Sequence, residues 1–230
     1  MRLLIALLLT SVAIPPSLRG LDLDHVPMRQ KDVVLTFDAG GDAAGAWRIL
    51  RTLQRKHVVA TFFLTGRWVN QYRLLARFIG HRYPVGDHTY HHLPMTALSD
   101  STVVREITTG ASAIRLRARR DPRPLFRFPY GASNSRVIGI ANRLGYVSIR
   151  WTVDTLGWMG AAHQSVYGAI HRVVDSLRPG EIILMHVGSA GDVDGSTIDT
   201  HALAGVIDAV RRHGYGFTTF PASWRRAGRP

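Results

Sequence analysis

Short apolar segments alternate along the chain with longer segments in which apolar residues recur at helical spacing. Residues 33–37 form a β-branched and apolar run typical of a buried parallel strand, and residues 43–56 carry apolar side chains near the spacing of one helix face. The same alternation predicts further strands at 58–64, 83–86, 125–127, 147–153, 181–185 and 216–219, and further helices at 70–79, 100–120, 135–144, 165–177 and 200–212.

This order of elements predicts an α/β fold. About seven consecutive strand-helix units, with no linker rich in proline, glycine or serine between them, favour a (β/α) barrel. A doubly wound open sheet is the alternative, but residues 37–42 read Phe-Asp-Ala-Gly-Gly-Asp where such a sheet usually carries a glycine-rich phosphate loop. We therefore expect a barrel that forms a single domain over residues 21–230.

Residues 1–20 have the pattern of a secretory leader. Arg2 precedes an apolar run that ends before Pro15-Pro16, and Ser11-Val12-Ala13 offers a cleavage site of the small-x-small type. The run is too short for a membrane-spanning helix, which needs about twenty residues. We expect export and a secreted or wall-associated protein without a membrane span. A buried first strand or an uncleaved anchor is the alternative.

Composition restricts the chemistry. The chain has no cysteine, so a metal ion would have to be bound by histidine, aspartate or glutamate. The 29 basic residues, of which only Lys31 and Lys56 are lysines, outnumber 16 acidic ones and give a net charge of +13. Such a charge favours polyanions such as an anionic cell wall. We expect no nucleic-acid binding, because no zinc finger, basic zipper or glycine-aromatic strand motif is present.

Ionisable residues stand directly after five of the predicted strands. In a (β/α) barrel the carboxyl ends of the strands meet at one rim, where the catalytic groups of such enzymes lie. We therefore expect these five residues to share a pocket: Asp38, His88, Arg127, Asp154 and His186.

Two of the histidines have the spacing of a metal-ligand pair. His88 and His92 are four residues apart, and on one helical turn they would point at a single position and suit a tetrahedral zinc site. The spacing alone is weak evidence in a chain with eleven histidines. Thr89 stands where a zinc metalloprotease helix carries its glutamate, which excludes that class.

Five motifs in sequence order resemble those of the NodB-homology polysaccharide deacetylases of carbohydrate esterase family 4. They span most of residues 33–220 and read Thr36-Phe37-Asp38, His88-Thr-x-x-His92, Arg127-Phe-Pro-Tyr-Gly131, Asp154-Thr-Leu-Gly-Trp158 and Leu184-Met-His186. The resemblance implies a distorted (β/α) barrel with about seven strands, in agreement with the number of units counted above.

The resemblance also implies a hydrolysis assisted by a divalent metal, most simply zinc, which acidifies water and polarises the amide carbonyl. His88 and His92 are the implied metal ligands, and Asp38 is the implied base. Arg127 would keep Asp38 ionised, while His186 would protonate the departing amine.

The remaining implied roles concern the substrate. The backbone N–H of Tyr130 would stabilise the oxyanion, and Trp158 and Leu184 would form the pocket for the acetyl methyl group. Pro129 is expected beside them at the substrate.

Two positions depart from the family pattern. The metal-binding carboxylate that normally follows the base is replaced by Ala39, and we expect Asp42 to supply it, since Gly40 and Gly41 permit the required backbone path. A helix N-cap is the alternative role of Asp42.

The second departure is Gly157, which replaces the aspartate that normally orients the acid histidine. Asp154 remains near that strand end and is kept among the catalytic candidates. Asp192 and Asp194 are further substitutes, although a solvated turn explains them better.

The sequence therefore predicts a secreted, metal-dependent enzyme that removes N-acetyl groups from a polysaccharide, either cell-wall peptidoglycan or a chitin-like glycan. An O-acetyl esterase of the xylan type is one alternative, because esters need less help from a leaving-group acid. A catalytically inactive barrel that binds glycan is the other, because two carboxylates are missing.

Overall fold

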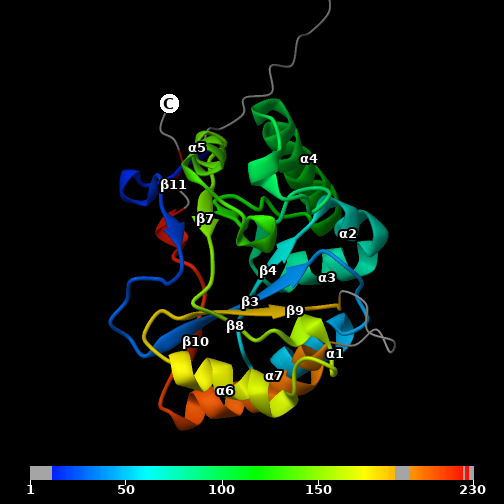
Figure 1. Ribbon diagram of the computed structural model, residues 1–230, viewed down its shortest axis with the longest axis vertical. Helices are drawn as coiled ribbons and strands as arrows, with labels where there is room; N and C mark the ends of the chain where they lie inside the picture. The colour runs from blue at the N-terminus through cyan, green and yellow to red at the C-terminus, as the bar shows by residue number, and fades with distance from the viewer. Residues whose placement is uncertain (1–11, 190–196, 225, 228–230) are drawn as a thin grey trace, which may run out of the picture.

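The computed structural model, which describes residues 12–189, 197–224 and 226–227, contains a parallel sheet surrounded by helices (Figure 1). The strands follow the order β2-β7-β6-β5-β4-β3-β9-β8, and β10 pairs with the first part of β3. Every pair in this sheet is parallel. The strands are β2 (Asp22–Leu23), β3 (Asp32–Ala39), β4 (Thr61–Leu64), β5 (Val85–Asp87), β6 (Leu125–Phe126), β7 (Val147–Ile149), β8 (Val153–Asp154), β9 (Ile182–His186) and β10 (Gly216–Thr218).

Seven α-helices in the described part of the chain pack against this sheet. Five begin at a Ser, Thr or Asn whose side chain accepts a hydrogen bond from a backbone N–H three residues on, the usual N-cap. They are α2 (Gly66–Gln71), α4 (Asp100–Ala118), α5 (Ser135–Arg143), α6 (Val166–Ser176) and α7 (Ile198–Arg212); the other two are α1 (Ala46–Arg55) and α3 (Arg73–Arg82).

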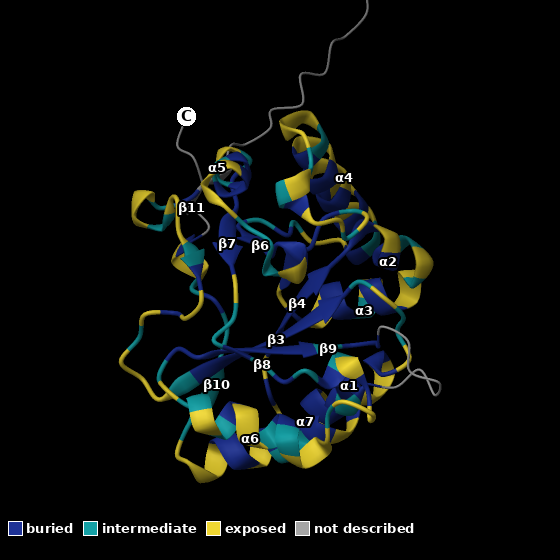
Figure 2. Ribbon diagram, in the orientation of Figure 1, coloured by how far each residue is buried: buried dark blue, intermediate teal, exposed yellow. Residues whose placement is uncertain are grey.

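The core lies on both faces of β3. All residues of this strand after Asp32 are buried, as expected for a central parallel strand covered on both sides. Phe37 stacks on Phe62 of β4, with ring centroids 5.1 Å apart. Figure 2 shows that the strands are buried inside the molecule and that the helices expose their outer faces.

The sheet curls because its two ends are joined by very little chain. β7 lies next to one end of the strand order and β8 forms the other end, yet only residues 150–152 separate them in sequence. Three residues span at most about 14 Å from Cα to Cα of the flanking strands. The distorted (β/α) barrel predicted from the sequence is thereby confirmed.

Two predicted elements are wrong in detail. The strand expected at 147–153 is two strands, β7 and β8, which pair with different neighbours. The helix expected at 70–79 is interrupted at Tyr72. This residue has φ of −111° and ψ of 57°, which is not helical, and it separates α2 from α3. The other predicted helices and strands are present, with ends shifted by a few residues.

Part of the expected leader contacts the domain. β1 (Val12–Ala13) pairs antiparallel with β11 (Arg226–Ala227), and Ile14 is buried in an apolar cluster with Trp224. Residues 1–11 lie outside the described part of the chain. Among the described residues, no helix has the length and apolar character needed to cross a membrane.

Candidate active site

A cavity of about 420 Å³ opens at the carboxyl ends of the strands. The structure brings together four of the five residues expected there as cavity-lining groups, and the fifth, Arg127, lies buried behind Asp38. The lining residues are Asp38, Gly40, Gly41, His88, His92, Tyr130, Trp151, Asp154, Trp158, Leu184, His186, Gly188 and Ser189.

Asp38 is bound by a fully buried arginine. Arg127 Nη1 donates to Asp38 Oδ1 at 2.7 Å and to Thr36 Oγ1 at 3.0 Å. Burial by itself would raise the pKa of Asp38, but the charge of Arg127, with smaller contributions from His88 and His186, lowers it below its usual value. Asp38 is therefore a carboxylate kept ionised inside the protein.

The two histidines of the predicted metal pair face one another. His88 Nδ1 lies 2.8 Å from the carbonyl oxygen of Arg127, which can only accept, so Nδ1 donates and Nε2 of the neutral ring is unprotonated. The Nε2 atoms of His88 and His92 are 3.1 Å apart. Burial lowers the pKa of His88, and burial followed by the charge of His88 lowers the pKa of His92 to about 3.

This pair is not on a helical turn, as the spacing had suggested. Thr89 has φ of 68° and His92 has φ of 63°, so two left-handed residues bend the segment after β5 into a loop. The loop is tied to α4, because Glu106 accepts from both the backbone N–H and Nδ1 of His91. The two imidazoles therefore converge through backbone shape and not through helical periodicity.

The histidine pair fits a divalent cation. Two Zn–N bonds of about 2.0–2.1 Å at a tetrahedral angle separate their nitrogens by about 3.4 Å, close to the observed separation. Without a cation, Nε2–H of His92 can donate to the unprotonated Nε2 of His88, and a bound cation would take the place of that proton. Asp38 Oδ2 lies 3.4 Å from His88 Nε2. Within the described residues, however, no three His, Asp or Glu side chains form a recognisable metal-ligand cluster.

The structure does not bring Asp42 to this pair. Its Oδ1 accepts from the backbone N–H of Ala44 at 2.8 Å, and its Oδ2 accepts from the backbone N–H of Ser189 at 3.1 Å. Asp42 thus connects the loop after β3 to the loop after β9. It is not the N-cap of α1 either, because that position is Gly45.

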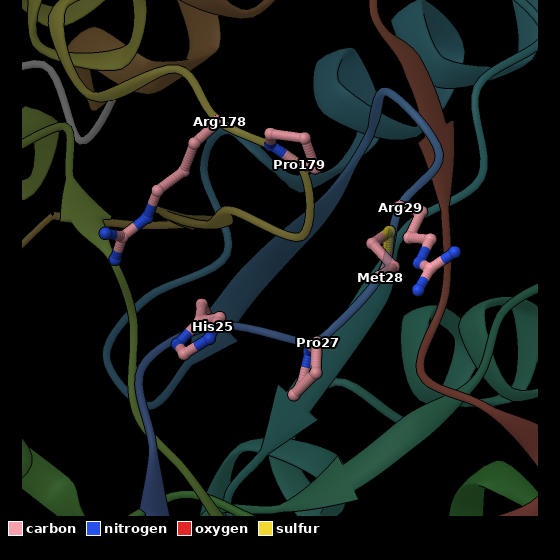
Figure 3. Close-up of a pocket in the computed structure, with 6 residues that line it drawn as sticks. All are labelled: His25, Pro27, Met28, Arg29, Arg178 and Pro179. Atoms are coloured by element: carbon pink, nitrogen blue, oxygen red, sulfur yellow. The ribbon is translucent and has the colours of Figure 1, made fainter.

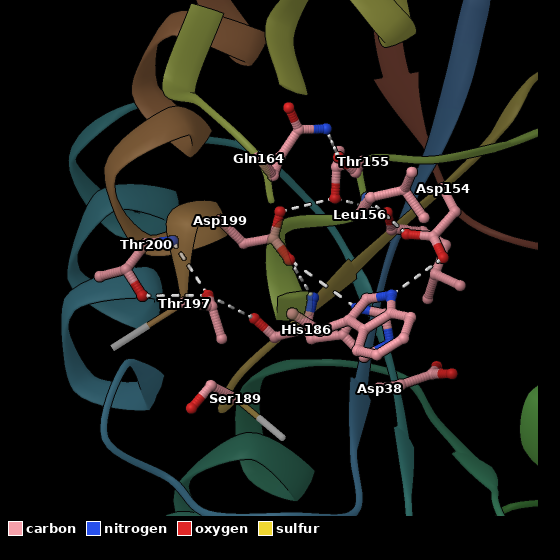
Figure 4. Close-up of polar contacts among 12 residues, drawn as sticks. Asp38, Asp154, Thr155, Leu156, Gln164, His186, Ser189, Thr197, Asp199 and Thr200 are labelled. Carbon is pink, nitrogen blue, oxygen red and sulfur yellow. Dashed lines mark hydrogen bonds and ion pairs between the residues drawn. The ribbon is translucent and has the colours of Figure 1, made fainter. Parts of the chain in front are cut away.

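His186 lies at the end of β9, on the other side of Asp38. Burial alone would lower its pKa, but the nearby carboxylate of Asp199 and the charges of Asp38 and Asp154 raise it. Asp154, whose pKa is raised by burial, accepts from the backbone N–H of Leu156 and from Trp158 Nε1 (Figure 4). Asp192 and Asp194, the other suggested partners of His186, lie outside the described residues.

Aromatic and apolar groups line the rest of the cavity. Trp158 lies with its ring centroid 6.2 Å from that of His186, and Leu184 lines the cavity from β9. Tyr130 packs edge-on against His92 and has φ of 60°, a left-handed conformation that is costly for a non-glycine residue. Pro129 is buried in the same turn and does not line the cavity.

Sequence reasoning missed several residues of the site, among them Trp151 and Asp199. Trp151 lines the cavity from the segment between β7 and β8, which had been expected inside a single strand. Asp199 lies in the first turn of α7, where an acidic residue normally indicates an exposed helix start, and yet it is fully buried. The sequence pattern contained no signal for its burial.

A second hollow of about 570 Å³ lies between residues 25–29 and Arg178-Pro179 (Figure 3). Its lining includes His25, Arg29 and Arg178 but no carboxylate. It therefore lacks the base and the histidine pair of the first cavity, which is the better candidate for an active site.

Comparisons with known proteins point to one family. A family model described as polysaccharide deacetylase matches residues 25–149. The chain is 27% identical over 207 residues to a chitooligosaccharide deacetylase of Azorhizobium caulinodans, covering 86% of this chain and 96% of the relative. It is 30% identical over 199 residues to a peptidoglycan-N-acetylglucosamine deacetylase of Bacillus cereus, covering 85% and 89%.

The fold is also similar to that of a protein described as a pseudoenzyme. The crystal structure of a carbohydrate esterase family 4 pseudoenzyme from Bacillus anthracis superposes with a TM-score of 0.77 at 29% identity. The match covers 86% of this chain and 66% of that chain. Similarity of fold therefore extends to a protein that is named as a pseudoenzyme.

Proposed function

The chain belongs to the polysaccharide deacetylase family, and from this we propose that it is a metal-dependent hydrolase that removes N-acetyl groups from a polysaccharide. One observation carries the proposal. Asp38, ionised by the buried Arg127, has His88 on one side and His186 in register on the adjacent strand, all at one cavity. A base, a metal-binding pair and an acid are the groups that amide hydrolysis requires.

His88 and His92 would hold the metal, for which zinc is the simplest candidate given the nitrogen donors. When bound, a zinc ion supplies Lewis-acid polarisation of the acetyl carbonyl and lowers the pKa of water. Asp42 is committed to two backbone N–H groups. We therefore propose that Asp38, whose Oδ2 faces His88 Nε2, takes the metal-binding role of the carboxylate that is missing at Ala39.

The residues of this chain would then divide the proton transfers. Asp38 accepts a proton from the attacking water, and the backbone N–H of Tyr130 donates to the oxyanion that forms at the acetyl carbonyl. His186 gives a proton to the nitrogen as the C–N bond breaks, which leaves acetate and a free amine. Trp158 and Leu184 supply an apolar wall for the acetyl methyl group.

The substrate is proposed from the relatives. Their names specify chitooligosaccharides and peptidoglycan, and both classes carry N-acetylated amino sugars. Peptidoglycan is favoured, because a net charge of +13 attracts the chain to an anionic wall. We propose that residues 1–20 direct export and that residues 21–230 form the catalytic domain of a secreted or wall-associated protein.

Acetate release separates the candidate functions. Zinc-loaded protein is incubated with N-acetylated peptidoglycan, N-acetyl chitooligosaccharides and O-acetylated xylan, each beside a chelated control. Release from an N-acetylated substrate supports the proposal, and release from xylan alone would assign an O-acetyl esterase. The matched variant Asp38→Asn should lose most of the turnover while the protein stays folded.

A catalytically inactive glycan-binding barrel is the second candidate. It is favoured by Ala39 and Gly157, which replace two expected carboxylates, and by the similarity to a named pseudoenzyme. In that case no acetate would be released from any of the three substrates, while the zinc-loaded protein would still bind glycan in a pull-down.

A further inference from the structure

Asp199 is a carboxylate buried against the acid histidine. It lies in the first turn of α7, fully buried, and both of its oxygens are hydrogen-bonded. Thr155 Oγ1 donates to Oδ1 at 2.6 Å, and the backbone N–H of His186 donates to Oδ2 at 2.8 Å (Figure 4). These bonds connect the start of α7 to the ends of β8 and β9. A buried carboxylate held this rigidly has a fixed direction toward its neighbours.

The position of Asp199 explains why residue 157 is a glycine. A Cβ atom on Gly157 would lie 2.2 Å from Asp199 Oδ1 and 2.4 Å from its Cγ, far inside contact distance. Gly157 is not among the glycines with positive φ, so its backbone does not require glycine. The absent side chain at 157 therefore leaves the space that the carboxylate of Asp199 occupies.

The imidazole of His186 needs a partner on its inner nitrogen. Its Nδ1 is buried and makes no hydrogen bond within the described residues, but Asp199 Oδ2 lies 3.7 Å away. The oxygens of Asp154 already accept from Leu156 and Trp158. Catalytic hydrogen bonds are often long in the absence of substrate and shorten when it binds.

We propose that Asp199 is the positioning residue of His186, supplying from the start of α7 the carboxylate that Gly157 lacks. Its Oδ2 accepts from Nδ1–H of the imidazole, which fixes the tautomer and turns Nε2 toward the cavity. A carboxylate behind an imidazole serves this purpose in other hydrolases. The inference rests on the proposed function, because it takes His186 as the acid that protonates the departing amine.

The test compares how Asp199→Asn changes kcat for substrates with different leaving groups. With an N-acetylated glucosamine oligomer, kcat should fall about 100-fold with little change in KM, as expected when a general acid is misaligned. With 4-nitrophenyl acetate, whose leaving group needs no proton, kcat should stay within about threefold. His186→Ala should show the same selectivity, and adding Asp199→Asn to it should cost nothing further. Equal losses on both substrates would overturn the proposal.

A second measurement does not depend on turnover. In ¹⁵N-imidazole NMR spectra, wild-type His186 should be protonated at Nδ1, and Asp199→Asn should shift it toward the Nε2–H tautomer. Asp208→Asn, an exposed aspartate of the same helix that pairs with Lys56, is the matched control and should leave the tautomer unchanged. An unchanged tautomer in Asp199→Asn would overturn the proposal. Absence of acetate release by the wild type would instead overturn the proposed function, while the NMR result would still decide the role of Asp199.

Discussion

Arg127 shows how much of the site depends on one buried side chain. Its guanidinium donates to four oxygens, on Thr36, Asp38, Ile149 and Arg150, and its charge lies 4.1 Å above the ring of Phe63. A planar group with five donors can satisfy these directions at once, whereas the ammonium of lysine cannot. The ionisation of Asp38 and the joining of three strands thus depend on the same residue.

Replacing Arg127 should therefore destabilise the protein strongly. Arg127→Met leaves Asp38 buried without a counter-charge, which costs about 3–5 kcal/mol in the free energy of unfolding. Urea denaturation of the metal-free protein measures this cost. Adding Asp38→Asn should recover a substantial part of the loss, and a loss below about 1 kcal/mol in the single variant would contradict this role.

Glu181 should make stability depend on pH. It is fully buried, and burial raises its pKa from the usual 4.5 to about 7, although Ser176 and the backbone N–H of Arg178 donate to it. Because the folded pKa exceeds the unfolded one, the folded state holds its proton more tightly. Stability should then fall as pH rises from about 4.5 to about 7, by on the order of 3 kcal/mol.

Glu181→Gln isolates this contribution. Its amide can accept from the N–H of Arg178 and donate to the hydroxyl of Ser176, so both contacts persist. Chemical denaturation at pH 5 and pH 8 should show a smaller decrease in the variant than in the wild type. The same pH dependence in both proteins would show that Glu181 does not titrate as described.

The alternation of strands and helices could be predicted from the sequence. Strands appear as short apolar runs, and helices appear as longer segments in which apolar residues recur at helical spacing. The positions of Asp38, His88 and His186 at strand ends followed from the same reading. The split between β7 and β8 could not be predicted, because it depends on how the sheet ends meet. The left-handed loop at Thr89 and the burial of Asp199 were also hidden, since tertiary contacts determine both.

Asp42 connects two active-site loops in the structure, and its substitution distinguishes this role from metal binding. Asp42→Ala should lower the melting temperature by a few degrees through loss of its two backbone partners, a loss comparable to that of a helix cap at about 1 kcal/mol. Zinc affinity should stay within about threefold of the wild type, whereas His92→Ala should lose binding by far more. A large loss of zinc affinity in Asp42→Ala, measured by titration, would restore Asp42 as the third ligand.

At the scale of the whole molecule, the curled sheet places every candidate catalytic group at one rim, while the positive charge is spread over the chain. The charge of +13 belongs to residues distributed from the N-terminal segment to the C-terminal one. A diffuse field of this kind attracts anionic polymers over about one Debye length without specific contacts. Attraction to the wall and chemistry at the cavity should therefore be separable.

Salt concentration should affect wall binding and turnover differently. Binding to purified anionic cell walls should fall by an order of magnitude or more between about 0.05 and 0.5 M salt, because exposed charges are screened. The turnover of a neutral N-acetyl chitooligosaccharide should change much less over that range, because Asp38 and Arg127 are buried. Sedimentation of the protein with wall fragments measures the first quantity. Wall binding that is insensitive to salt would contradict an electrostatic attraction.

Asp38, with the histidine pair beside it, should form a working deacetylase site despite the alanine at position 39. The most direct test is the acetate released from N-acetylated peptidoglycan by the zinc-loaded wild type, measured beside Asp38→Asn and beside the wild type in chelator. We expect repeated turnover by the wild type, and a loss of about 100-fold or more in both comparisons. Equal acetate release in all three samples, or none above background in the zinc-loaded wild type, would contradict it.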